Sequence, residues 1–102
     1  MYNSKISGLG FYLPENIVTN NDLAKIMDTS DNWIKERTGI EERRWVKSDS
    51  EDTTSVMGVK AANLAINDAN LKNKDIDFII FATLSPDYFF PGSGVMVQDM
   101  MD

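Results

Sequence analysis

The side chains best suited to binding chemistry in this sequence are Trp33 and Arg37, which lie four residues apart in a segment with helical periodicity. Residues at this spacing share one face of a helix. An indole beside a guanidinium can stack a planar base and pair with a phosphate. The alternative is a packing role, with a tryptophan at the edge of the core covered by the arginine stem. Helical spacing alone favours packing.

Residues that commonly carry out catalysis are missing. The 102 residues include no cysteine and no histidine, so the chain has no thiol nucleophile and no imidazole for proton transfer near neutral pH. Zinc sites built from these residues are excluded for the same reason. Asp49, Glu51 and Asp52 cluster in one polar stretch, but their spacing is not that of a calcium-binding loop. We therefore expect a solvated loop there, no catalytic residue and no metal site.

Two glycine-containing stretches resemble parts of phosphate-binding loops. The third glycine of a dinucleotide fingerprint that began at Gly8-Leu9-Gly10 would fall at Leu13, and no helix follows directly. Gly92-Ser93-Gly94 precedes a helix, whose start can bind an anion, but the Lys-Ser/Thr of a P-loop is absent. The first stretch therefore predicts a glycine-containing strand, and the second predicts loop closure.

The first half of the chain is predicted to form a strand followed by two short helices. Apolar residues over 5–13 indicate the strand. Thr19-Asn20-Asn21-Asp22 has the pattern of a capping box at a helix start. Ser30 is a good N-cap for a second helix, which Gly39 can close in the left-handed conformation. Residues 40–46 are expected to be extended.

The second half of the chain predicts a helix and a buried strand. The helix covers residues 55–69 and is rich in small residues, which allow another backbone to approach closely. These are Gly58, Ala61, Ala62, Ala65 and Ala69. The apolar run within 76–84 is typical of a strand covered on both faces. An aromatic loop then leads into a helix start, and this alternation implies an α/β architecture. A strand covered on both faces needs neighbours, so we expect the chain to be cut from a larger protein.

Composition excludes some classes of partner. The net charge of −6 argues against a nucleic-acid binder, which usually has a basic surface, and disfavours unaided binding to anionic membranes. No apolar run is long enough to span a bilayer. The sequence therefore predicts a cytoplasmic protein that binds neither nucleic acid nor membranes.

Several motifs, taken together and in order, resemble the beta-ketoacyl-acyl-carrier-protein synthase III family. The most specific are Thr29–Ile34 and Glu36–Ile40. The others are Gly10–Glu15, Val18–Asn20, Asp22-Leu23, Glu42–Arg44, Ala61-Ala62, Ala82-Thr83, Ser85–Asp87 and Phe90-Pro91. The resemblance extends over nearly the whole chain.

This resemblance implies the thiolase fold, which has five layers built from two similar halves, and a homodimer. Family members condense an acyl-CoA primer with malonyl-acyl carrier protein to start fatty-acid synthesis, using a cysteine, a histidine and an asparagine. Residues 1–102 would be roughly the first third of such an enzyme, as an incomplete mixed sheet flanked by helices. All three catalytic residues would then lie beyond Asp102, so this chain alone is expected to be inactive. No cofactor is expected, since acyl-CoA is a substrate.

The resemblance also assigns roles to individual residues. It implies that Trp33 stacks on the CoA adenine, that Arg37 contacts the CoA phosphates, and that Thr29 and Thr38 lie at the same nucleotide site. An arginine from the missing part would cover the other side of the adenine. This reverses the preference for a packing role.

The aromatic loop receives a role from the same resemblance. Phe90 matches a phenylalanine that crosses the dimer to line the acyl pocket of the partner subunit, where it would select chain length. An aromatic anchor within the dimer interface is the compatible alternative. Tyr88 and Phe89 depart from the commonest family pattern, so the sequence does not assign the primer.

Two further hypotheses remain open. One is a related condensing enzyme of secondary metabolism, which only the missing pocket residues and substrate tests would distinguish. The other is a non-catalytic interaction module that binds a partner or a complementary chain.

Overall fold

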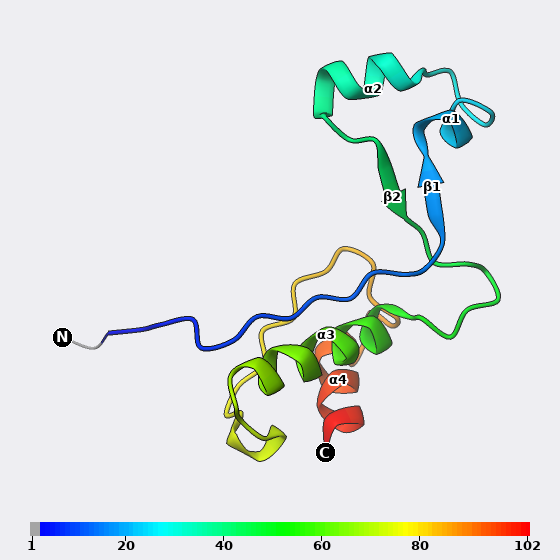
Figure 1. Ribbon diagram of the computed structural model, residues 1–102. Helices are drawn as coiled ribbons and strands as arrows, with labels where there is room; N and C mark the ends of the chain where they lie inside the picture. The colour runs from blue at the N-terminus through cyan, green and yellow to red at the C-terminus, as the bar shows by residue number, and fades with distance from the viewer. Residues whose placement is uncertain (1–2) are drawn as a thin grey trace. The chain divides into compact units, whose positions relative to one another are not determined.

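The computed structural model describes residues 3–102, so the first two residues of the expected 1–102 segment lie outside the described part (Figure 1). The chain divides into two units. One consists of Leu13–Ser50, and the other combines the residues up to Tyr12 with Glu51–Asp102. Each unit is described separately below.

The unit of residues 13–50 combines a small hairpin with two helices. Its elements in chain order are β1 (Ile17–Thr19), α1 (Asn20–Leu23), α2 (Asp31–Thr38) and β2 (Glu42–Arg44). The two strands pair antiparallel, with Val18 opposite Arg43. Residues 40–46, expected to be extended, thus include a strand.

Local hydrogen bonds fix the helix boundaries of this unit. Thr19 Oγ1 accepts from the backbone N–H of Asp22 at 3.2 Å, and an Asp22 carboxylate oxygen accepts from the N–H of Thr19 at 3.0 Å. The predicted capping box is therefore confirmed. Ser30 caps α2 by accepting from the N–H of Trp33 at 3.2 Å. Gly39 ends α2 at φ +71°, the left-handed conformation that glycine adopts most readily.

The second unit is built around two helices. Its elements are α3 (Thr54–Asp68), a 3₁₀ turn at Asn73–Asp75, and α4 (Ser93–Met101). The long helix expected at 55–69 is confirmed with a shift of one residue. The side chains of Ile66 in α3 and Val97 in α4 are buried, and both line a pocket whose wall includes residues 76–81.

The two strands predicted for this unit, over residues 5–13 and 76–84, are not formed, and this prediction was wrong. Figure 1 shows both segments as extended chain without strand arrows. Within the described residues, no backbone–backbone hydrogen bond reaches residues 3–13 or 77–84. A strand needs N–H and C=O partners on a neighbouring strand, and the described part of this unit supplies none.

The small-residue face of α3 carries the extended N-terminal segment. A Cβ added at Gly8 would lie 2.3 Å from the carbonyl oxygen of Ala65. At Gly10 it would lie 2.3 Å from the carbonyl oxygen of Ala61 and 2.4 Å from the nitrogen of Ala65. The segment therefore packs backbone against backbone on α3, as the small side chains of this helix predict.

Candidate functional site

The pair Trp33 and Arg37 lies on an exposed face of α2. Ile34 is buried at 8% exposure and anchors the helix, while its neighbour Trp33 points outward and is 53% exposed. The guanidinium carbon of Arg37 lies 4.7 Å from the centroid of the Trp33 ring. The structure thus places the two side chains on one face of the helix, as their spacing predicts, and in cation–π contact with each other.

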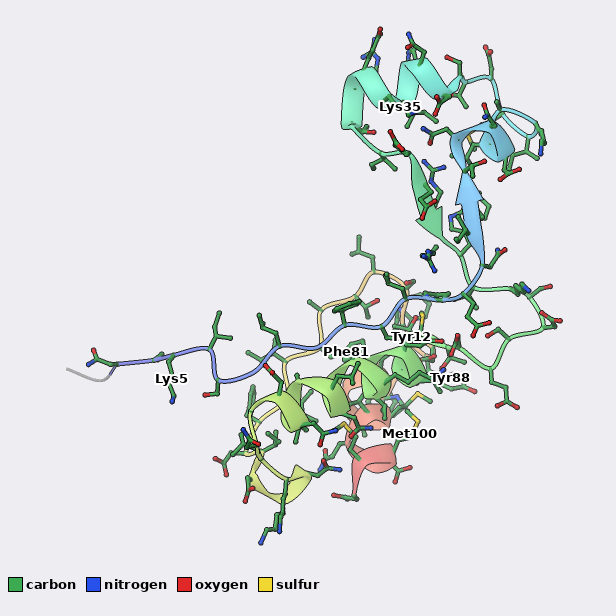
Figure 2. The ribbon with its side chains drawn as sticks, viewed as in Figure 1. Lys5, Tyr12, Lys35, Phe81, Tyr88 and Met100 are labelled. Atoms are coloured by element: carbon green, nitrogen blue, oxygen red, sulfur yellow. The ribbon has the colours of Figure 1, made fainter. Side chains whose placement is uncertain are left out.

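Arg37 is the cation of α2 that remains available to a ligand. Within the described residues it makes no ion pair. Lys35, labelled in Figure 2, pairs instead with Asp31 at 3.1 Å and Glu41 at 3.4 Å. The hydrogen bond with Asp31 is the main reason that the pKa of Lys35 is raised. Because Lys35 is already engaged, Arg37 is the better candidate for pairing with an anionic group.

The two threonines of the expected nucleotide site differ in availability and lie at opposite ends of α2. Thr38 donates its hydroxyl proton to the carbonyl of Ile34 at 2.8 Å and accepts from the N–H of Ile40 at 3.1 Å. The Thr29 hydroxyl oxygen is enclosed and has no partner among the described residues. An eight-residue helix is roughly 12 Å long, so the structure does not bring the two hydroxyls together.

A buried asparagine connects this face to the hairpin, and sequence reasoning missed it. Asn20 is 1% exposed. Its Nδ2 donates to Asp31 at 2.9 Å and to the carbonyl of Ile40 at 2.7 Å, while its Oδ1 accepts from Arg43 at 2.5 Å. The bond from Asn20, followed by that from Lys35, lowers the pKa of Asp31. In sequence, this asparagine reads only as part of a capping pattern.

Asp87 fixes the base of the aromatic loop in the other unit. Its carboxylate accepts from the backbone N–H of Ser55 at 2.9 Å and from the hydroxyl of Ser93 at 2.8 Å. Burial raises the pKa of Asp87, but hydrogen bonds from Thr53, Ser93 and Ser55 outweigh it and lower the pKa to about 2. One carboxylate thus joins the first turns of α3 and α4.

The aromatic side chains after Asp87 project from this anchored base. Tyr88, labelled in Figure 2, is 63% exposed, and Phe89 and Phe90 are 97% and 91% exposed. Three adjacent exposed aromatic residues form an apolar patch that water solvates poorly. Phe90 is thus free to contact another chain, as its expected role requires.

A polar cluster around Tyr12 was also missed by sequence reasoning (Figure 2). The Tyr12 hydroxyl donates to Asp52 at 2.7 Å, and Lys60 pairs with the same carboxylate. The Lys60 ammonium lies 4.3 Å from the centroid of the Tyr12 ring. Hydrogen bonding to Asp52, and then to Tyr12, raises the pKa of Lys60. The side chain of Asp52 is only 13% exposed, so the prediction of a solvated loop was wrong at this residue.

This Tyr12 cluster fastens the extended N-terminal segment to the start of α3. Its lysine is held in the charged form, which suits neither a nucleophile nor a general base. Among residues 3–102, no three acidic residues converge as a metal site would require. In the same residues, no helix is both long and apolar enough to cross a membrane.

Comparison with known proteins gives consistent matches in sequence. The beta-ketoacyl-[acyl-carrier-protein] synthase III of Clostridium novyi is 48% identical over 99 residues, which is 97% of this chain and 30% of that protein. The synthase III 1 of Bacillus anthracis is 50% identical over 97 residues, covering 95% of this chain and 31% of that protein. No model of a protein family matches the chain.

Solved structures match in fold as well. The 3-oxoacyl-[acyl-carrier-protein] synthase III of Aquifex aeolicus superposes with a TM-score of 0.89 at 48% identity, covering 97% of this chain and 31% of that one. The priming beta-ketosynthase of the R1128 polyketide pathway superposes with a TM-score of 0.87 at 30% identity, covering 95% of this chain and 28% of that one. OleA of Xanthomonas campestris gives 0.79 at 22% identity, which shows the fold alone.

These matches confirm the resemblance that the motifs indicated. The chain is homologous to the N-terminal third of beta-ketoacyl-acyl-carrier-protein synthase III enzymes, and it has the corresponding part of their thiolase-like α/β fold. It spans about 30% of the length of the curated relatives it matches.

Proposed function

We propose that this chain is the N-terminal part of a beta-ketoacyl-acyl-carrier-protein synthase III enzyme. Residues 1–102 would then form the first segment of its thiolase fold. The whole enzyme would condense an acyl-CoA primer with malonyl-acyl carrier protein to initiate fatty-acid synthesis. The observation that carries the proposal is the exposed Trp33–Arg37 pair on α2 in a chain with about 50% identity to such enzymes.

In this proposal, the face of α2 binds the nucleotide of acyl-CoA. Half of the Trp33 surface is exposed and can stack on the adenine. Arg37 has no competing carboxylate within the described residues and can pair with the CoA phosphates. The Thr29 hydroxyl oxygen has no partner among the described residues, but it is enclosed, so Thr29 would have to move to contact the nucleotide. Thr38 can offer only a lone pair, because its proton is bonded to Ile34.

Catalysis requires residues outside this chain. With no cysteine and no histidine among its 102 residues, the chain has no group to carry the acyl intermediate. The proposal therefore predicts an inactive chain on its own and a cytoplasmic homodimer for the whole enzyme. Exposed Phe89 and Phe90 support a subunit contact in which Phe90 lines the acyl pocket of the partner subunit.

A condensing enzyme of secondary metabolism is the second candidate. The priming ketosynthase of a polyketide pathway matches this chain at a TM-score of 0.87, close to the value for the Aquifex enzyme. Its lower identity, 30% against 48%, favours the fatty-acid enzyme. The two functions differ in primer choice, which a panel of short and branched acyl-CoA thioesters would reveal.

The nucleotide site is tested by Trp33→Ala in the full-length protein. Loss of base stacking should raise the KM for acyl-CoA about tenfold, since one aromatic–base stack contributes roughly 1–3 kcal/mol. The KM for the matching acyl-pantetheine, which lacks the nucleotide, should not change. Trp45→Ala is the matched control, because Trp45 is also exposed but lies outside α2. Equal KM values for acyl-CoA in wild type and Trp33→Ala would refute the site.

A further inference from the structure

One buried carboxamide connects both ends of α2 to the rest of its unit. Asn20 Nδ2 donates to Asp31, the first residue of α2, at 2.9 Å. The same nitrogen donates to the carbonyl of Ile40 at 2.7 Å, directly after the Gly39 that ends the helix. One amide nitrogen thus joins the side chain of the first residue of α2 to the backbone just beyond the end of the helix.

The other side of the carboxamide is held by the hairpin. Asn20 Oδ1 accepts from Nη2 of Arg43 at 2.5 Å, while Nη1 of Arg43 donates to the carbonyl of Val18 at 3.1 Å. The backbone N–H of Asn20 donates to the carbonyl of Glu41 at 3.2 Å. Both amide protons and the amide oxygen are therefore used, which fixes the orientation of the carboxamide.

These polar tethers matter because α2 has little else to hold it. A helix of eight residues is too short to be stable by itself in water. Ile34 is its one buried residue in the described chain. Hydrophobic packing through one side chain restrains rotation about the helix axis poorly. Directional hydrogen bonds to the first residue of α2 and to the chain just after its end restrain it better.

We propose that Asn20 is a positioning residue for the nucleotide site: it holds the face of α2 that carries Trp33 and Arg37 in its binding orientation. This inference rests on the proposed role of that face in binding acyl-CoA. Asn20 is 1% exposed, so it does not touch the ligand and acts only through the helix.

The test uses Asn20→Ala in the full-length protein, with acyl-CoA and the matching acyl-pantetheine as parallel substrates. A misplaced stacking face should raise the KM for acyl-CoA about tenfold, since small displacements of positioning groups are costly. The kcat and KM for acyl-pantetheine should stay within about twofold of wild type, because that substrate lacks the nucleotide that α2 contacts. General structural damage would instead impair both substrates alike.

A second variant guards against failure of Asn20→Ala to fold. Asp31→Ala removes one of the two tethers, together with the ion pair to Lys35, at a side chain that is 38% exposed. It should raise the KM for acyl-CoA about threefold, as the loss of one net hydrogen bond allows. Asn32→Ala is the matched control, since the Asn32 amide lies on the same helix and, among residues 3–102, donates only to Glu36, at 3.0 Å. The ratio of its KM for acyl-CoA to its KM for acyl-pantetheine should equal that of wild type.

Trp33→Ala, measured alongside, separates the two proposals. If Trp33→Ala raises the KM for acyl-CoA while Asn20→Ala and Asp31→Ala do not, the positioning role is overturned and the nucleotide site stands. If Trp33→Ala has no effect, both are overturned. Equal losses with acyl-CoA and acyl-pantetheine in Asn20→Ala would assign the residue to general stability and overturn the inference. If Asn20→Ala does not fold, Asp31→Ala decides.

Discussion

Gly10→Ala is expected to be one of the most destabilising small substitutions in the chain. The added Cβ would lie 2.3 Å from the carbonyl oxygen of Ala61 and 2.4 Å from the nitrogen of Ala65. Both contacts are about 1 Å shorter than the usual separation of non-bonded atoms. The neighbours are helix backbone, which cannot rotate away as a side chain could. The extended segment must therefore move off α3.

The magnitude follows from this geometry. Overpacking by one methyl group typically costs about 1–3 kcal/mol, and rigid neighbours place Gly10→Ala near 3 kcal/mol. The free energy of unfolding of a small protein falls by about 1–3 kcal/mol for each molar of urea, so the urea concentration at the unfolding midpoint should fall by roughly 1–3 M. Circular dichroism at a helix-sensitive wavelength would report this midpoint, because the segment packs directly on the long helix α3.

Gly94→Ala supplies the matched control in the same unit. Gly94 lies in α4. A Cβ added there would meet only the Cβ of Phe81, at 3.3 Å. Gly94 is the second residue of α4, where alanine is favoured over glycine by up to about 1 kcal/mol, and this gain offsets the tight contact. The midpoint of Gly94→Ala should lie within about 0.5 M of wild type. Equal midpoints for Gly10→Ala and wild type would refute backbone-to-backbone packing of the segment on α3.

Two further predictions concern the aromatic loop. Because the pKa of Asp87 is lowered to about 2 from 3.8, its stabilising contribution is complete above pH 3.8 and is lost as the pH falls toward 2. Asp87→Ala should therefore be less stable than wild type at neutral pH, and its free energy of unfolding should fall less between pH 5 and pH 2. Urea unfolding across this range would show the difference, and parallel curves of stability against pH for the two proteins would contradict it. In the full-length enzyme, Phe90→Ala should shift the ratio of kcat/KM values toward longer primers, with Phe89→Ala as the neighbouring control, and an unchanged ratio would remove Phe90 from the pocket.

The helices could be predicted from sequence because their signals are local. Ser30 caps α2 three residues from the N–H that it accepts, and Gly39 ends the same helix directly after its last residue. The small residues of α3 likewise predicted the close approach of another backbone. Each of these features depends on neighbouring residues or on the composition of a single face.

The strands were not predictable in the same way. An apolar run such as 76–84 indicates a strand only if neighbouring strands supply hydrogen-bond partners. The relatives are about three times as long as this chain, so such partners can come from sequence that is not part of it. Large apolar side chains in both segments are correspondingly exposed, including Phe11 at 75%, Phe78 at 80% and Ile80 at 86%. Hydrophobic pattern identified the segments but could not supply their partners.

The polar anchors escaped prediction because their partners are distant in sequence. Asn20 bonds to residues 11, 20 and 23 positions away, and Asp87 bonds to Ser55, 32 positions away. Asp52 is paired with Tyr12, 40 positions away, although it lies in a stretch that looks solvated. Residue type gave no signal in these cases, since Asn and Asp are common in turns and loops.

The position of Arg37 constrains how the proposed nucleotide site would work. Its guanidinium already stacks on the Trp33 ring at 4.7 Å, so an adenine must occupy the opposite face or displace it. The first arrangement would leave Arg37 on the far side of the indole ring from the base, while the second would release it toward the phosphates. In the part of the chain that the structure describes, the hydrogen bonds that hold α2 lie within residues 13–50. The orientation of Trp33 and Arg37 is therefore set by this unit's own contacts, and substitution of the buried Asn20 should change it without removing a group that touches the ligand.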